Sequence, residues 1–155
     1  MLAAVAILLA SGCHRRNSRE TLESEQVEAT LVVSPVLTNI SSDCGLHFTY
    51  RNGQDAGALS IVESLGGGVG IADFDRDGWQ DVFCPGGGGF KLKEALSGLP
   101  HGYFRQIETL EFEDRSLAAG IHDSRRYSHG CAIGDFDNDG FSDVLVTGYG
   151  GLELF

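Results

Sequence analysis

The sequence contains the stretch Asp73-Phe-Asp-Arg-Asp-Gly-Trp-Gln-Asp81 and repeats its pattern at Asp135-Phe-Asp-Asn-Asp-Gly-Phe-Ser-Asp143. The second copy begins 62 residues after the first, so the chain carries an internal repeat and not a chance acidic cluster. Each copy places four carboxylates within nine residues, and these would repel one another in a compact loop. A Ca²⁺ ion, which prefers oxygen ligands, would remove that repulsion. Both stretches therefore predict calcium loops.

The spacing of the loop predicts the ligands of each site. Side chains at positions 1, 3 and 5 converge on one centre, and the glycine at position 6 allows a sharp turn with positive φ. The backbone carbonyl at position 7 and the aspartate at position 9 would complete the oxygen shell. The predicted ligands are Asp73, Asp75, Asp77, Trp79 and Asp81 in the first site, and Asp135, Asp137, Asp139, Phe141 and Asp143 in the second.

The residues around each loop distinguish it from an EF-hand. An EF-hand needs a glutamate at position 12 and a helix on each side. Position 12 is Cys84 in the first copy and Val146 in the second. The flanking segments, such as 68–72 and 144–147, are short, bounded by glycine or rich in β-branched residues, which is typical of strands. Each loop is therefore predicted to join two strands of a hairpin.

The pattern D-x-D-x-D-G-x-x-D between two strands resembles the FG-GAP/VCBS repeats, the calcium-binding blades also seen in integrin α-subunit propellers. The sequence around the two loops is similar to the start of the ASPIC/UnbV group, the bacterial relatives of cartilage acidic protein. It runs from Glu63-Ser-Leu-Gly-Gly-Gly-Val-Gly-Ile-Ala-Asp73 to Val146-Thr-Gly-Tyr-Gly-Gly151. The resemblance covers roughly residues 44–155. It implies an all-β fold of β-propeller-type blades.

The strand pattern predicts about one and a half blades of an incomplete β-propeller. Strands are expected at 68–72, 79–84, 102–107, 110–113, from about 128 onward, and at 152–155. An opening strand is expected within 41–50, where Leu46, Phe48 and Tyr50 alternate, and the glycine run 86–89 is expected to be a flexible loop. Because propellers typically need four to eight blades, the chain is expected to be a fragment or to complete itself by association.

The N-terminal part is predicted to be a lipoprotein-type signal peptide (1–12) followed by an anchor and linker (13–43), ahead of the repeat region 44–155. Residues 1–10 form an apolar run too short to span a bilayer. Leu9-Ala-Ser-Gly-Cys13 resembles a bacterial lipobox, in which the cysteine becomes lipidated. The alternative, an ordinary buried helix, is less favoured, because residues 1–10 have neither a polar face nor a capping signal.

This N-terminal pattern predicts an exported protein that meets the membrane only through a lipid anchor on Cys13. It would be found in the cell envelope, as an outer-membrane or periplasmic lipoprotein, or outside the cell. Cys44, Cys84 and Cys131 remain, and they could provide one disulfide with one cysteine left over or stay as buried free thiols.

The composition excludes one class of partner. The net charge of −11, without a basic stripe to neutralise phosphates, argues against nucleic acid as a partner.

Two functional classes remain. The first is a non-enzymatic calcium-binding repeat module with an adhesion-like role toward a protein or carbohydrate at the cell surface. The second is the N-terminal propeller scaffold or carbohydrate-binding part of a larger exported enzyme, and the fold does not decide between them.

Overall fold

The computed structural model describes residues 36–91, 95–122 and 126–155. All the strands in these residues belong to one compact unit, Leu37–Phe155. The predicted signal peptide and the predicted lipidation site Cys13 lie outside the described residues. Within the part of the chain that is described, no helix has the length and apolar character needed to cross a membrane.

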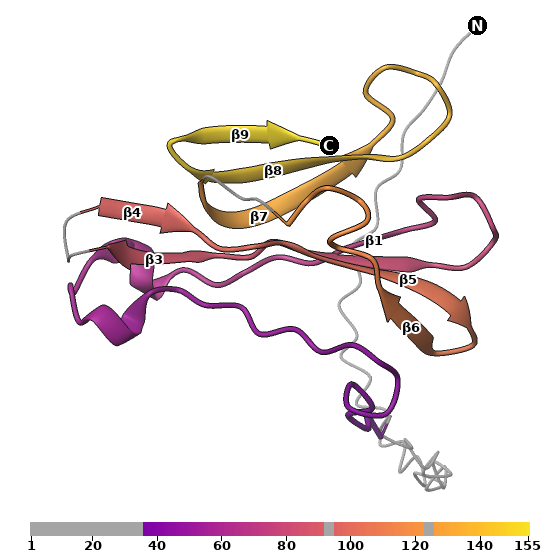
Figure 1. Cartoon of the computed structure of the whole chain (residues 1–155), viewed down its shortest axis with the longest axis horizontal. Helices are drawn as coiled ribbons and strands as arrows, with labels where there is room; N and C mark the ends of the chain where they lie inside the picture. Colours follow the sequence, from indigo (N-terminus) through magenta and orange to yellow (C-terminus); the bar gives the residue numbers. More distant parts are fainter. Residues whose placement is uncertain (1–35, 92–94, 123–125) are drawn as a thin grey trace, which may run out of the picture. The chain divides into compact units, whose positions relative to one another are not determined.

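The first sheet contains four antiparallel strands in the order β1-β2-β5-β6. Figure 1 labels three of them, β1, β5 and β6. The strands are β1 (Gly70–Ala72), β2 (Asp81–Cys84), β5 (Gly102–Glu108) and β6 (Glu111–Asp114). A short hairpin of β3 (Gly88–Lys91) and β4 (Ala95–Gly98) is inserted between β2 and β5. Four antiparallel strands joined in sequence form a sheet of the kind found in propeller blades. This confirms the predicted all-β, blade-type fold.

The second sheet repeats the first three positions of this arrangement. It has the order β7-β8-β9, from β7 (Tyr127–Gly134), β8 (Asp143–Tyr149) and β9 (Gly151–Leu154). The first acidic loop joins β1 to β2, and the second joins β7 to β8, both antiparallel pairs. The loops therefore lie between hairpin strands, as the sequence predicts. The sheets amount to one four-stranded blade and three strands of a second, slightly more than the predicted one and a half blades.

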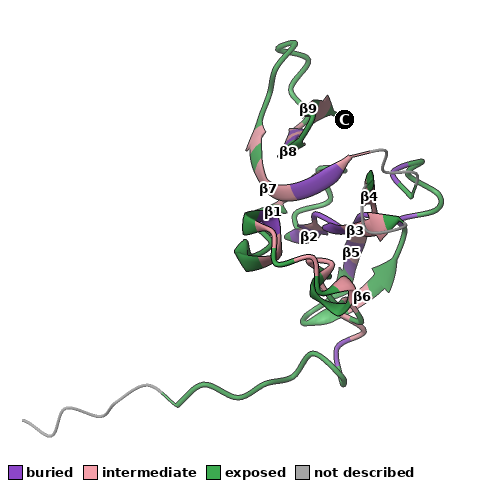
Figure 2. Cartoon of the chain, turned by 90° about the vertical axis from the view of Figure 1, so that its left-hand side faces the viewer, coloured by how far each residue is buried: buried purple, intermediate pink, exposed green. Residues whose placement is uncertain are grey.

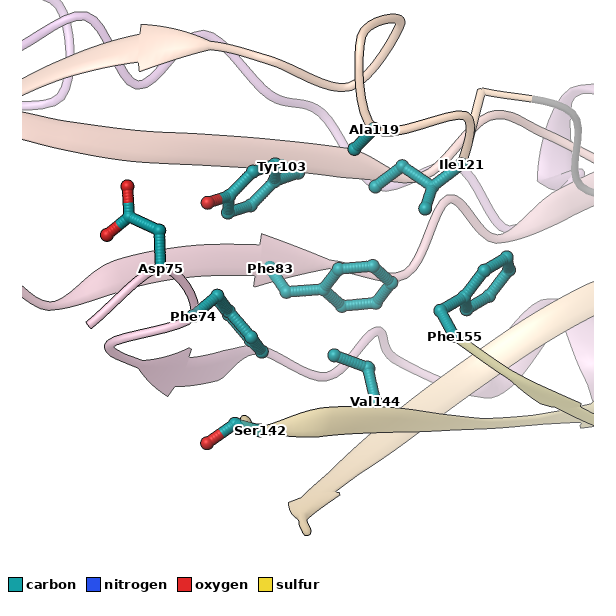
Figure 3. Close-up of a pocket in the computed structure, with 9 residues that line it drawn as sticks. All are labelled: Phe74, Asp75, Phe83, Tyr103, Ala119, Ile121, Ser142, Val144 and Phe155. Carbon is teal, nitrogen blue, oxygen red and sulfur yellow. The ribbon is translucent and has the colours of Figure 1, made fainter. Parts of the chain in front are cut away.

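The core lies where the two sheets face each other. Phe83 of β2 is only 2 % exposed and packs with Ile121, Val144 and Val146. Tyr103, the residue paired with Phe83 on β5, also packs against this cluster, so this face of the first sheet is turned toward the second. Figure 3 shows the Phe83 ring pointing between Val144 and Phe155. This apolar contact holds the second sheet against the first.

The glycine run 86–89 corrects a prediction, because it is not a flexible loop. The Gly87 N–H donates to the Ser128 hydroxyl at 2.8 Å, and the Gly88 N–H donates to the Arg51 carbonyl at 2.9 Å. A Cβ added at Gly87 would lie 2.1 Å from that same carbonyl oxygen. The glycines are present because three backbone segments approach closely here, and β3 begins within the run.

The expected opening strand within 41–50 is also wrong. Residues 41–45 form a turn, in which the Cys44 N–H donates to the Ile40 carbonyl, and residues 46–50 are not in a strand. Phe48 nevertheless packs edge-to-face on Phe104 with ring centroids 6.3 Å apart. Phe48 is therefore held by side-chain packing on β5 and not by pairing with a neighbouring strand. After it come two short 3₁₀ helices, Gln54–Ala56 and Ile61–Ser64.

The three described cysteines are free, which settles the two alternatives left by the sequence. Cys44 is buried, and Cys84 and Cys131 are half-buried. Burial raises the pKa of the Cys84 thiol to about 11, with a smaller contribution from Cys131. The Cys84 thiol therefore stays protonated and unreactive at neutral pH.

A buried histidine makes the stability of the fold depend on pH. His101 contacts the rings of Phe83 and Phe155, which also contact each other, and its Nδ1 accepts the Gly86 N–H at 3.0 Å. Its Nε2 lies 3.6 Å from a carboxylate oxygen of Glu153. Burial lowers the pKa of His101 below its usual value of 6.5, although Glu153 opposes this effect. The folded state therefore binds fewer protons than the unfolded state.

We expect the free energy of unfolding to decrease as the pH falls below about 6.5, by up to about 1.4 kcal/mol per pH unit from this one group. Urea unfolding between pH 5 and 7 measures the slope. His101→Gln should flatten it, whereas His122→Gln, at an exposed histidine, should leave it unchanged. Equal slopes for the parent and His101→Gln would contradict the assignment.

Candidate metal centre

The two acidic segments, named loop 1 (Asp73–Asp81) and loop 2 (Asp135–Asp143), fold in the same way. The carboxylate at position 1 accepts the backbone N–H groups of positions 5 and 6, at 3.0 and 2.9 Å in loop 1 and at 3.1 and 2.9 Å in loop 2. Position 3 accepts the N–H of position 5, at 3.3 and 3.1 Å. Position 5 accepts the N–H of position 7, at 2.9 and 2.8 Å. The repeat in the sequence is therefore a repeat of the local structure.

The backbone of each loop turns at two positions. The glycines at position 6 have φ of 94° (Gly78) and 87° (Gly140), which agrees with the sequence prediction. Position 4 is also left-handed, with φ of 61° at Arg76 and 62° at Asn138. Sequence reasoning missed this second turn, although asparagine at position 4 of loop 2 was a signal, because asparagine tolerates this conformation better than most residues.

Three carboxylates converge in each loop. Their oxygens lie within 4.8 Å of one another in the groups Asp73, Asp75 and Asp77 of loop 1 and Asp135, Asp137 and Asp143 of loop 2. Asp81 and Asp139, the other two predicted carboxylate ligands, are not part of these groups. Trp79 and Phe141, whose carbonyls are predicted ligands, lie partly exposed at position 7. Loop 2 is exposed along 135–141 (Figure 2).

Asp81, at position 9 of loop 1, is held inside the fold by hydrogen bonds from the protein. Its side chain is fully buried and accepts three hydrogen bonds, from the Phe74 N–H at 3.2 Å, the Tyr103 hydroxyl at 3.0 Å and the Gln106 N–H at 2.9 Å. Burial, with Asp81 next in effect, raises the pKa of Tyr103, so the hydroxyl remains a donor. Asp81 therefore joins loop 1 to β5.

The equivalent residue in loop 2 is less buried. Asp143 accepts the Phe136 N–H at 2.6 Å, which matches the bond from Phe74 to Asp81. Within the described residues it accepts no bond from a third strand. Asp143 consequently turns an oxygen toward the other carboxylates of its loop, whereas Asp81 does not.

Two arginines lie at the loops, and sequence reasoning missed both contacts. Arg105 of β5 bonds to the carboxylates of Asp75, through Nε, and Asp77, through Nη2 at 2.6 Å. The guanidinium of Arg76 lies 3.7 Å from the centre of the Phe141 ring, a cation–π contact that joins loop 1 to loop 2. Neither pair is close in sequence, so no local pattern could indicate it.

The donor set of each loop fits a hard divalent cation. Every converging ligand is a carboxylate oxygen, which is the ligand type that Ca²⁺ prefers. The loop amides bind one oxygen of each carboxylate at positions 3 and 5. In loop 1 the second oxygens of Asp75 and Asp77 bond to Arg105, a cationic side chain, whereas in loop 2 no ion pair among the described residues uses the corresponding oxygens. This division of each carboxylate between an amide and a cation is the chemistry expected of a calcium loop.

A cavity of about 210 Å³ adjoins loop 1 between the two sheets. Figure 3 shows its wall of apolar side chains, with Asp75, Tyr103 and Ser142 as the polar residues among those labelled. Asp75 and Tyr103 already bond to Arg105 and Asp81, respectively. The cavity is therefore mainly a gap in the packing between the sheets.

No family model matches the chain. It is 32 % identical over 107 residues to integrin alpha-3 from Cricetulus griseus, an alignment that covers 63 % of this chain and 10 % of that protein. It is 31 % identical over 85 residues to integrin alpha-3 from Mus musculus, which covers 53 % of this chain and 8 % of that protein. The chain thus spans about a tenth of the length of these relatives. These similarities agree with the resemblance of the acidic loops to FG-GAP repeats, and they support the relationship at that level.

Proposed function

We propose that this chain is a calcium-binding repeat module of the FG-GAP type, with a structural and adhesion-like role. The observation that carries the proposal is the identical hydrogen bonding of loops 1 and 2 around converging carboxylates, 62 residues apart. The similarity to integrin alpha-3 supports an interaction module. The proposed partner is a protein or carbohydrate at the cell surface.

The proposed ions are structural and not catalytic. In loop 1 the ligands would come from Asp73, Asp75 and Asp77, and in loop 2 from Asp135, Asp137 and Asp143, with the position 7 carbonyls and the remaining aspartates as further candidates. Bound Ca²⁺ would supply positive charge at the turn of each hairpin. The chain's own residues then hold β1 against β2 and β7 against β8, while carboxylate repulsion no longer opposes the closed turn.

Isothermal calorimetry of the full chain with Ca²⁺ tests the proposal. We expect two sites in the parent and one in Asp137→Asn, because amide oxygen is a weaker ligand than carboxylate and cancels no charge. Asp55→Asn, at an exposed aspartate outside both loops, is the matched control and should retain both sites. Absence of calcium-dependent heat from a folded parent chain would overturn the proposal.

The finer assignments are proposals as well. We propose relationship to the ASPIC/UnbV group, a domain order of signal peptide (1–12), anchor and linker (13–43) and repeat region (44–155), and a cell-envelope or extracellular location. The lipobox resemblance at Cys13 supports lipid anchoring. Mass spectrometry of the protein from its native host is the test, since an unmodified Cys13 in the membrane fraction would contradict lipidation.

A further inference from the structure

We propose that Arg105 is a tethered cation which occupies loop 1 without metal and is displaced when a divalent cation binds there. The two calcium sites are consequently unequal. The inference rests on the proposed calcium function and adds to it a residue, from a different strand, that controls the affinity of one site.

The contacts of Arg105 place its charge between two predicted ligands. Its Nε donates to Asp75 Oδ2, and its Nη2 donates to Asp77 Oδ2 at 2.6 Å. The Asp75 and Asp77 side chains are 35 % and 26 % exposed, and that of Arg105 is 33 % exposed. The guanidinium therefore bridges two carboxylates that would otherwise repel each other.

The guanidinium and a metal ion would compete for the same atoms. Asp75 Oδ1 accepts the Asp77 N–H, and Asp77 Oδ1 accepts the Trp79 N–H, so these oxygens are used by the loop backbone. The remaining Oδ2 atoms are the ones bound by Arg105. A Ca²⁺ ion needs direct oxygen contacts at about 2.3–2.6 Å, which leaves no room for N–H donors along the same direction. Entry of the ion therefore requires Arg105 to leave.

The position of Arg105 is built into the sheet. Arg105 shares a face of β5 with Tyr103, whose hydroxyl donates to Asp81 of loop 1. The next residue, Gln106, donates its backbone N–H to the same carboxylate at 2.9 Å. On the opposite face, Phe104 is 1 % exposed and packs against Phe48, which anchors β5 from that side. β5 is thus attached to loop 1 on both sides of Arg105.

Loop 2 provides the internal comparison. Its Asp137 and Asp139 use Oδ1 for the matching amide bonds, and no ion pair among the described residues joins their Oδ2 atoms to a basic side chain. Arg76 lies near loop 2, but its guanidinium stacks on the Phe141 ring. Loop 2 therefore accepts a cation without first releasing one.

Terbium luminescence separates the two sites. Trp79 is the only tryptophan of the chain and lies in loop 1, so Tb³⁺ emission excited through the indole reports binding there. Titration of the full chain in an Asp137→Asn background removes the contribution of loop 2, and Ca²⁺ competition then gives the calcium affinity of loop 1. Arg105→Gln should bind about fivefold more tightly, because the competing ion pair is lost. Arg105→Lys keeps the charge but loses the planar guanidinium that bonds both carboxylates. Its loop 1 affinity should lie between those of the parent and Arg105→Gln.

Arg115→Gln is the matched control. Arg115 follows β6, pairs with Glu113 at 2.8 Å and does not touch loop 1. Arg115→Gln removes the same unit of positive charge as Arg105→Gln. We expect the calcium affinity of loop 1 in Arg115→Gln to equal that of the parent chain. Thermal unfolding in chelator adds a second readout, in which Arg105→Gln should show a lower midpoint than Arg115→Gln because loop 1 has lost its internal counter-ion.

The outcomes distinguish the two proposals. If neither Tb³⁺ nor Ca²⁺ binds the parent chain, the calcium function itself fails. If both ions bind and Arg105→Gln leaves the loop 1 affinity unchanged or weakens it, Arg105 is not a displaced cation and this inference is overturned, while the calcium function stands.

Discussion

Replacement of Asp81 by alanine is expected to destabilise the chain by roughly 3 kcal/mol or more, both in calcium and in chelator. The carboxylate is fully buried and accepts hydrogen bonds from two backbone N–H groups and the Tyr103 hydroxyl. Alanine would leave three donors without an acceptor, of which the Gln106 N–H is buried and the other two are partly buried. A buried donor that loses its acceptor costs about 1–3 kcal/mol. Urea unfolding of the parent and variant, with and without EDTA, measures the loss.

The equivalent substitution in loop 2 is the control for this prediction. Asp143 occupies the same position of the repeat but is only half-buried, and it accepts the Phe136 N–H without bonds from a third strand among the described residues. In chelator, Asp143→Ala should therefore cost much less than Asp81→Ala. A loss from Asp81→Ala that appeared in calcium and vanished in EDTA would show instead that Asp81 acts only through a bound ion.

Calcium is expected to raise the free energy of unfolding by about 2.7 kcal/mol per site at a hundredfold excess over Kd. The ion binds the folded loop and not the unfolded chain, so its binding free energy adds to stability. Asp137→Ala should lose the contribution of loop 2, since it removes one of the three converging carboxylates. In chelator, Asp137→Ala and the parent should converge, because among the described residues Asp137 accepts only an exposed hydrogen bond within its own loop.

Asp55→Ala, at an exposed aspartate outside both loops, should retain the full calcium-dependent stabilisation. The structural interpretation of loop 2 would be wrong if Asp137→Ala also retained it. The same titration can be followed by thermal unfolding, in which the midpoint of the parent should rise with the free Ca²⁺ concentration.

The sequence by itself determined the local architecture. A nine-residue pattern specifies its own turn, because the hydrogen bonds from positions 5, 6 and 7 all end on side chains within the same loop. The strand-like segments on each side then predict a hairpin, and the repeat predicts two of them. For these reasons the loops, the hairpins and the all-β fold follow from the order of the amino acids alone.

Only the tertiary structure decided how the two copies differ. Asp81 and Asp143 hold the same position in the pattern, yet Asp81 is buried against Tyr103 and Gln106 of β5 and Asp143 is not. Arg105 contacts Asp77 of loop 1, although it lies 28 residues further along the chain. These contacts depend on which strand pairs with β2 and in which register, and that choice is made by burial of the sheet faces. No residue pattern within a loop encodes it, because the free energy that selects the pairing comes from the core between the sheets.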